Sequence, residues 1–308
     1  MAHKFTVVHR KDLNNVGDMS ANPLQYFLKP HQYNVVDITS LGYQKYQTHI
    51  PLIAGGGGLI ANDFFGDILK ETLSSADRIR LLEMWSEFWK VSDPINVELR
   101  EEFNNKAKSL IQEYLKKIKD TSAPRIIWGA GHNEDTNKRI KRLNYPSWLV
   151  EFDEVGVRDF GQEHEWVPCA SCMHPALRKK YPIKNKVIWF EHKKQLIKGP
   201  NFGSDPIPRY VNSGDNIDHT IELLGSSEII ITNSYHGAYW GTLLGKKVIV
   251  DSAWSTKFWS MKHTPRILNK GEDWKNVLDE EYSYDQDPLE DCISATENYW
   301  NRIKEYMQ

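Results

Sequence analysis

Residues 228–250 constrain the fold of this chain more than any other segment. Residues 228–232 (Glu-Ile-Ile-Ile-Thr) are typical of a buried strand, and 247–250 (Lys-Val-Ile-Val) of a second one. Between them, 234–244 has the length and composition of a helix, which Gly245 ends. A strand–helix–strand unit of this kind joins two parallel strands by a crossover. The sequence therefore predicts an α/β protein with largely parallel sheets.

The same alternation of short apolar runs and longer amphipathic stretches extends over the 308 residues. At roughly 100–200 residues per domain, this length suits two domains. We expect Rossmann-like α/β domains over 1–150 and 151–308, the second with a closing C-terminal helix, facing a cleft of the kind that commonly holds ligands. Further strands are expected at 5–9, 34–38, 51–54, 125–128, 155–158 and 186–190, and helices within 76–120, at 215–224 with Asp215 as cap, and at about 287–306.

Composition excludes several classes of function. Lys plus Arg is 39 and Asp plus Glu is 41, and the resulting net charge of −2 argues against nucleic-acid binding by bulk electrostatics. No apolar run approaches the roughly 18 residues that a membrane span needs, and the first residues lack the apolar core of a signal peptide. Cys169, Cys172 and Cys292 are too few for a disulfide framework, which favours a cytoplasmic protein.

The sharpest candidate site is the junction at 233–237 (Asn-Ser-Tyr-His-Gly), after the strand at 228–232. Open α/β sheets bind ligands at the carboxyl ends of their strands. The unpaired amides and the dipole of a helix N-terminus attract anions, and Ser234 is placed to cap the helix. A neutral His236 beside a bound anion would suit proton transfer. A capped helix with a histidine satisfied by its neighbours is the alternative.

Glycine-rich turns and one arginine are further candidates. Gly55 to Gly58 follow an apolar run, and four glycines exceed what a tight turn needs, so we favour a loop that faces substrate. Gly129-Ala130-Gly131 is a weaker version of the same pattern. Arg158 follows a short strand and suits two-point contact with a carboxylate or phosphate. An ion pair between Arg158 and Asp159 is the alternative.

The pattern of Cys169, Cys172 and His174 invites comparison with zinc sites. A structural zinc site needs four ligands, and only His164 lies near enough in the sequence to be the fourth. No second pair of cysteines with this spacing exists. We therefore expect buried thiols near the cleft, and no metal.

Together these motifs resemble the polysaccharide pyruvyl transferase family. The resemblance spans about residues 10–252. The family is similar in fold to the two-domain glycosyltransferases called GT-B, so the resemblance implies a GT-B-like arrangement of the two domains. The segments that carry it are Asn15-Val16-Gly17-Asp18, residues 53–58 (Ile-Ala-Gly-Gly-Gly-Gly), Gly129-Ala130-Gly131, Val157-Arg158-Asp159, and Ser234-Tyr235-His236-Gly237 leading into Leu244-Gly245-Lys246-Lys247.

The resemblance implies transfer of a pyruvyl group from phosphoenolpyruvate to a sugar of a polysaccharide or its precursor, giving a ketal and phosphate without a cofactor. His236 would be the acid–base group and Arg158 would grip the donor. A lipid-linked acceptor would bring peripheral contact with a membrane. The donor-binding residues would be Asn233, Ser234, Tyr235, Gly237 and Lys257, and the acceptor-binding residues Asn15, Asp18, Gly56, Gly57, Gly58 and Gly131.

The chain departs from the family pattern at Ser234, where some members carry an arginine two residues before the motif histidine. Arg209, Lys257 and Arg266 are candidates to supply the missing positive charge. Two other functions stay open at this point. One is a GT-B-type glycosyltransferase that uses a nucleotide-sugar, and the other is a non-catalytic protein that binds a sugar or an anion.

Overall fold

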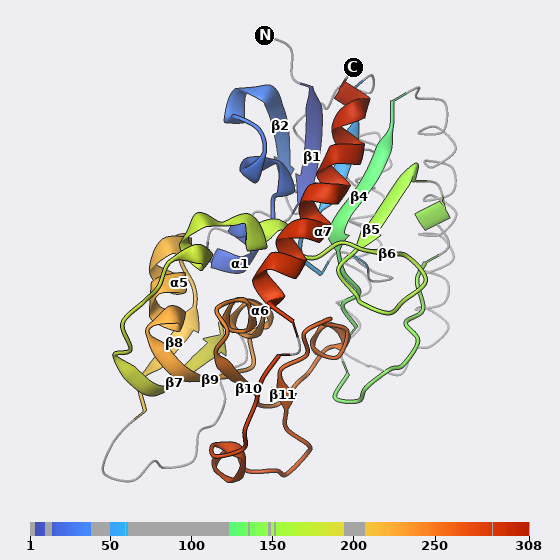
Figure 1. The fold of residues 1–308 in the computed structure, drawn as a ribbon. Helices are drawn as coiled ribbons and strands as arrows, with labels where there is room; N and C mark the ends of the chain where they lie inside the picture. The colour runs from blue at the N-terminus through green and yellow to red at the C-terminus, as the bar shows by residue number, and fades with distance from the viewer. Residues whose placement is uncertain are drawn as a thin grey trace, which may run out of the picture.

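The chain forms two parallel β-sheets, drawn one above the other in Figure 1. This confirms the expected α/β class with parallel sheets. The helices expected within 76–120 lie outside the described residues. The computed structural model describes residues 4–9, 14–37, 50–58, 60, 123–134, 136–146, 149–150, 152–193, 207–284 and 286–307.

The first sheet has the strand order β2-β1-β3-β4-β5-β6, and every neighbouring pair is parallel. The carboxyl ends of its strands therefore share one edge, from which Gly56, Gly131 and Arg158 follow. Only the two-residue β6 was not expected. The strands are β1 (Phe5–His9), β2 (Tyr33–Asp37), β3 (Leu52–Gly55), β4 (Arg125–Ala130), β5 (Glu154–Val157) and β6 (Glu165–Trp166).

The second sheet has the order β11-β10-β9-β7-β8 and is also parallel throughout. The expected strand–helix–strand unit is confirmed as β9, α6 and β10. β8 and β11 were not expected, because neither is an apolar run. The elements are β7 (Asn185–His192), β8 (Arg209–Asn212), α5 (Ile217–Gly225), β9 (Ser227–Thr232), α6 (Tyr235–Leu243), β10 (Lys247–Val250) and β11 (Arg266–Ile267).

Short helices complete the described chain. α1 (Val16–Ser20) follows β1, and Asn15 caps it by accepting hydrogen bonds from the amides of Gly17 and Asp18. Asn216, and not the expected Asp215, caps α5. The 3-10 turns are η1 (Pro23–Tyr26), η2 (Pro30–Gln32), η4 (Ala170–Met173), η5 (Pro175–Arg178), η6 (Thr256–Phe258), η7 (Trp274–Val277) and η8 (Lys304–Met307).

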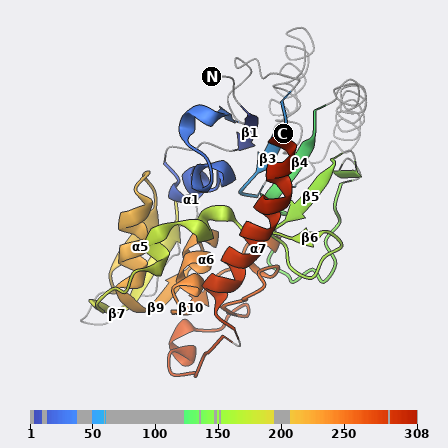
Figure 2. The same ribbon diagram turned by 45° about the horizontal axis from the view of Figure 1, so that its top comes forward.

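The closing helix, α7 (Pro288–Ile303), runs from the second sheet to the first (Figures 1 and 2). Near its start, Cys292 packs in the same apolar cluster as α6. Near its end, Tyr299 packs with Trp128 and donates a hydrogen bond of 2.6 Å to the carbonyl of Ile127. The domain division at residue 150 stays a prediction, but the first sheet continues to Trp166 and α7 contacts the cores of both sheets.

Hydrogen bonds join the segment that follows β4 to the segment that follows β10. The amide of Thr136 donates to the carbonyl of Trp254 at 2.9 Å, and the amide of Thr256 donates to the carbonyl of Glu134 at 3.1 Å. The Ser255 hydroxyl adds a bond of 2.8 Å to Oδ1 of Asn133. The two carboxyl edges are thereby held together. In the described ranges, the search for an apolar helix long enough to cross a bilayer found none.

Candidate functional site

His236 lies between the two halves of the molecule. It stands in the first turn of α6 and is 6% exposed. On one side the ring meets the backbone of α1 so closely that a Cβ at Gly17 would lie 1.9 Å from Nδ1. On the other side Nε2 lies 3.7 Å from Sγ of Cys169. A glycine is needed at position 17 because any side chain would displace the imidazole.

Arg158, directly after β5, reaches the same place from the first sheet. Its guanidinium carbon lies 4.1 Å from the centre of the Tyr235 ring, the first residue of α6. The residue is 4% exposed, and Nε and Nη2 are buried without a hydrogen-bond partner. Gly131 leaves the room for this side chain, since a Cβ there would lie 2.1 Å from Nε of Arg158. A buried cation in this state costs free energy unless an anion joins it.

Asp159 does not supply that anion. Its Oδ2 accepts hydrogen bonds from the amide of His132 at 2.7 Å and from the hydroxyl of Tyr145 at 2.9 Å, and its Oδ1 accepts from the hydroxyl of Ser260 at 2.8 Å. Across the described residues, no ion pair includes Arg158. The structural ion pair considered as the alternative for Arg158 is therefore not formed.

The N-terminus of α6 carries no side-chain cap. Ser234 occupies the cap position with an extended backbone, but its hydroxyl does not bond to the helix amides. The expectation that this side chain caps the helix is wrong, because Oγ of Ser234 accepts a bond of 3.2 Å from Nδ2 of Asn212. The first-turn amides of a helix have no partner within the helix. The side chain of Ser234 therefore leaves the first-turn amides of α6 uncapped.

Asn15 and Asp18 connect to this junction through Asn212. Nδ2 of Asn212 donates to Oδ1 of Asn15 at 3.1 Å, and Nδ2 of Asn15 donates to Oδ2 of Asp18 at 2.9 Å. A row of polar side chains thus runs from α1 to Ser234. Asn212 was not expected from the sequence. It is a polar residue at the carboxyl end of a strand, but β8 itself was not expected.

Lys257 is the one of the three candidate cations that acts on His236. Lys257 is 9% exposed, its Nζ lies 3.8 Å from the centre of the Trp254 ring, and its charge lowers the pKa of His236. Arg209 instead pairs with Glu191, with Nη2 2.7 Å from Oε1. Arg266 pairs with Glu272 and Glu280.

The glycine run reaches the site through Gly131, whose amide donates to the carbonyl of Gly57 at 3.0 Å. Gly56 has φ of +78°, and a Cβ on it would lie 2.0 Å from the carbonyl oxygen of Ala21. A Cβ on Gly58 would lie 2.7 Å from Cβ of Asn133. These contacts are close backbone packing, and the expected contact with an acceptor sugar stays a prediction.

Asn233 and Gly237 hold the junction in place. Oδ1 of Asn233 accepts a bond of 2.7 Å from the amide of His192, which ties the junction to β7. At Gly237 a Cβ would lie 2.5 Å from the Phe190 ring, so the glycine lets α6 pack directly on β7. Both residues lie beside Tyr235 and His236 in the sequence, and these two contacts are with β7 of the second sheet.

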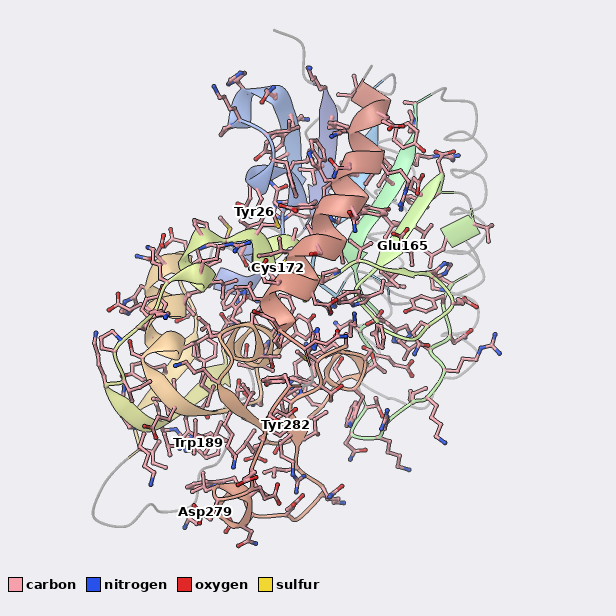
Figure 3. The ribbon with its side chains drawn as sticks, viewed as in Figure 1. Tyr26, Glu165, Cys172, Trp189, Asp279 and Tyr282 are labelled. Carbon is pink, nitrogen blue, oxygen red and sulfur yellow. The ribbon has the colours of Figure 1, made fainter. Side chains whose placement is uncertain are left out.

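The cysteines do not converge on a metal site. Sγ of Cys169 contacts the Ser171 hydroxyl at 3.3 Å, and Cys172 contacts the Thr296 hydroxyl at 3.3 Å beside α7 (Figure 3). Nδ1 of His174 accepts from the amide of Ala176. Throughout the part of the chain that is described, no group of three or more potential metal ligands gathers. The expected buried thiols are confirmed, and burial raises the pKa of Cys172 to about 12.

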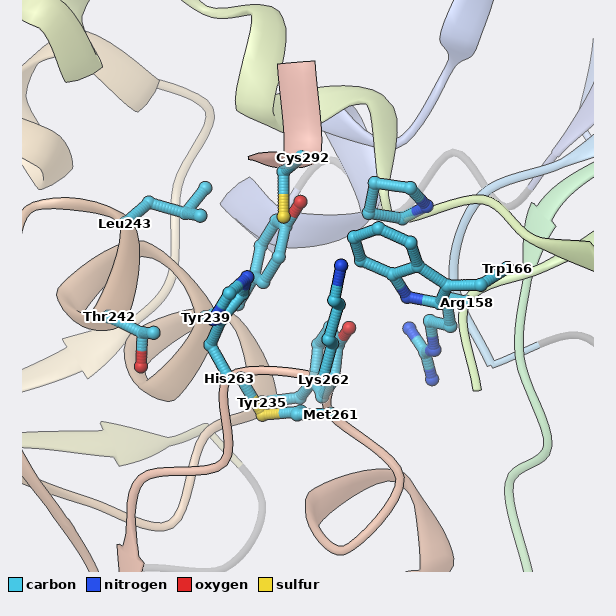
Figure 4. Close-up of a pocket in the computed structure, with 11 residues that line it drawn as sticks. Arg158, Trp166, Tyr235, Tyr239, Thr242, Leu243, Met261, Lys262, His263 and Cys292 are labelled. Carbon is cyan, nitrogen blue, oxygen red and sulfur yellow. The ribbon is translucent and has the colours of Figure 1, made fainter. Parts of the chain in front are cut away.

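A small pocket opens beside the guanidinium of Arg158 (Figure 4). Arg158 and Tyr235 line it together with apolar and aromatic side chains that include Trp166, Tyr239 and Cys292. Arg158 contacts the ring of Tyr235, and Tyr235 directly precedes His236. The pocket therefore adjoins the cationic site.

His236 is a neutral imidazole at ordinary pH. Burial first, and then the positive charges of Arg158 and Lys257, together lower its pKa to about 3. A bound anion would offset both charges and raise this pKa. The site therefore couples the protonation of His236 to the presence of an anion.

We expect acid to destabilise the fold through His236. In the unfolded chain this residue takes up a proton near pH 6.5, whereas in the folded protein it does so only near pH 3, so the unfolded state binds more protons in between. Stability should then fall as pH drops, by about 2 kcal/mol between pH 8 and pH 5 from this group. Urea unfolding of the wild type and of His236→Gln at both pH values measures it. An equal loss of unfolding free energy between pH 8 and pH 5 in the two proteins would contradict the expectation.

Comparison with known proteins adds no assignment to this site. No family model matches the sequence, and no curated protein matches it. The functional conclusion therefore depends on the geometry described above. Its central elements are the buried guanidinium of Arg158, the uncapped start of α6 and the imidazole of His236.

Proposed function

We propose that this protein is a transferase that moves a pyruvyl group from phosphoenolpyruvate onto a saccharide acceptor and forms a ketal. The observation that carries the proposal is the guanidinium of Arg158, buried with two unpartnered nitrogens over the first residue of α6. Phosphoenolpyruvate carries a carboxylate and a phosphate. A guanidinium binds one such group at two points, and uncapped helix amides bind the other.

The charge of the site favours this doubly acidic donor over a neutral sugar alone. Lys257 and Arg158 are both buried cations that act on His236. Burial strengthens electrostatic attraction to a ligand because less water screens it. A neutral saccharide would bring no negative charge to the buried, unpartnered nitrogens of Arg158. The acceptor therefore enters a site that the donor has already neutralised.

The reaction is balanced without a redox partner. One sugar hydroxyl adds to carbon 2 of the enol phosphate while carbon 3 takes up a proton and becomes a methyl group. The carbon–oxygen bond to phosphate then breaks, and a second hydroxyl bonds to carbon 2. The two hydroxyls release two protons, of which one ends on carbon 3 and the other on phosphate. An acid–base group must move these protons.

His236 is suited to that role in the presence of the donor. Its neutral ring can accept a proton from a sugar hydroxyl, and the bound dianion offsets Arg158 and Lys257, which raises the pKa of the imidazolium so formed. The first-turn amides of α6 stabilise the departing phosphate. Asn15, Asp18 and the turns at Gly56–Gly58 and Gly131 form the acceptor side in a GT-B-like arrangement of two domains.

The experiment that tests the proposal follows the leaving group. We expect incubation with phosphoenolpyruvate and an oligosaccharide acceptor to release one inorganic phosphate for each pyruvyl ketal formed, and a chelator to leave the rate unchanged. Release of a nucleotide from a nucleotide-sugar, with phosphoenolpyruvate untouched, would replace the proposal with a glycosyltransferase. Binding of phosphoenolpyruvate without turnover across a panel of acceptors would leave a binding protein.

A further inference from the structure

We propose that Asn212 is a positioning residue that keeps the N-terminus of α6 open for the anion by holding the hydroxyl of Ser234 away from it. The inference rests on the proposed function, in which an anion binds at that helix end. Asn212 ends β8 and lies between α1 and α6. It has no place in the sequence motifs.

The orientation of the Asn212 amide is fixed by its neighbour. Oδ1 of Asn15 accepts from the amides of Gly17 and Asp18, so this oxygen is an acceptor and must face a donor. Asn212 meets it at 3.1 Å and therefore presents Nδ2. The same nitrogen is 3.2 Å from Oγ of Ser234. The hydroxyl is turned toward Asn212 as a consequence.

Ser234 is otherwise well suited to cap α6. Serine is among the preferred residues at this position, and the extended backbone of Ser234 is the conformation that capping requires. The cap bond is nevertheless absent. The bond from Asn212 accounts for this, because it holds the oxygen away from the helix amides. An anion and the serine oxygen would compete for the same N–H groups.

The state of Asn212 argues against a purely structural role. The residue is 3% exposed, and its Oδ1 is buried without a hydrogen-bond partner. An unsatisfied buried acceptor is unfavourable, and a side chain selected only for stability would avoid it. In this arrangement Oδ1 of Asn212 accepts no hydrogen bond, and the side chain of Ser234 does not cap α6. What the arrangement gains is a helix N-terminus without a side-chain cap, at the residue whose ring Arg158 contacts.

The test is a pair of substitutions measured with inorganic phosphate as the probe, by calorimetric titration of the full chain. We expect Asn212→Ala to weaken phosphate binding roughly fivefold, the factor that a capping bond of ordinary strength is worth, because Ser234 then caps α6. Adding Ser234→Ala should restore the affinity, because no hydroxyl is then left to bond to the α6 amides. Asn216→Ala, which removes the cap of α5, is the matched control with wild-type affinity.

Restored affinity in the double variant supports the proposal, as does a crystal structure of Asn212→Ala with the Ser234 hydroxyl bonded to the α6 amides. Equal weakness of the single and double variants would overturn it, since Asn212 would then act by joining α1 to β8. Unchanged affinity in Asn212→Ala would overturn it as well. If Asn212→Ala does not fold, Asn212→Ser, too short to reach both partners, takes its place. A wild type that binds neither phosphate nor phosphoenolpyruvate overturns the proposed function and this inference together.

Discussion

His236→Gln is expected to lower kcat by at least about 100-fold while the affinity for phosphoenolpyruvate changes little. Glutamine keeps a polar side chain in the space between Gly17 and Cys169 but cannot shuttle a proton. Donor binding depends on Arg158 and the α6 amides, which this change leaves in place. Single-turnover phosphate release with saturating donor and acceptor measures the chemical step separately from binding.

His219→Gln is the matched control for this variant, because His219 lies on the exposed side of α5. Its turnover should equal that of the wild type. Wild-type turnover in His236→Gln would remove the imidazole from the mechanism, and the histidine satisfied by its neighbours would be the better interpretation. Loss of donor binding in parallel with kcat would instead indicate that the ring shapes the donor site.

The pH dependence of turnover extends this expectation. The free protein holds His236 neutral down to about pH 3. The acid limb of kcat/KM should therefore lack an ionisation of ordinary histidine between pH 6 and 7. In the donor complex the pKa rises toward that range, because the ligand offsets Arg158 and Lys257. The contrast between the profiles of kcat and kcat/KM thus reports the coupling between donor charge and proton transfer.

The strands that the sequence predicted correctly share one physical property. β1, β9 and β10 are apolar runs whose side chains are almost all buried, so their hydrophobicity shows directly in the sequence. β8 is an edge strand with Arg209 and Val211 exposed, and its pairing depends on β7 rather than on local composition. β6 and β11 have two residues each, too few for any periodicity.

The candidate site was predictable to the extent that its residues follow strands. Arg158 and His236 both stand at carboxyl ends in parallel sheets, and local sequence was enough to single them out. Their meeting was not predictable, because it depends on the packing of α1 and on missing side chains at Gly17 and Gly131. The hydrogen bond from Asn212 to Ser234 joins the end of β8 to the start of α6. No local sequence pattern indicates this hydrogen bond.

The second large effect is expected from Arg158→Met, which keeps most of the side-chain length and removes the charge. Two charge-assisted hydrogen bonds are lost, so inorganic phosphate should bind at least about 100-fold more weakly. The free energy of unfolding should rise by about 1–2 kcal/mol, since a buried cation whose Nε and Nη2 have no partner is replaced by an apolar group. The opposite signs of the two effects mark a residue kept for binding.

Arg209→Met is the control for the direction in which the free energy of unfolding changes. Arg209 pairs with Glu191, whose side chain is 4% exposed, so its loss takes the guanidinium contacts away from a buried carboxylate. That variant should lose about 3 kcal/mol of stability and keep wild-type affinity for phosphate. Urea unfolding gives the stability of each variant, and calorimetric titration gives its affinity for phosphate. If Arg158→Met is destabilised as Arg209→Met is, and still binds phosphate, then Arg158 is a structural cation and the donor site lies elsewhere.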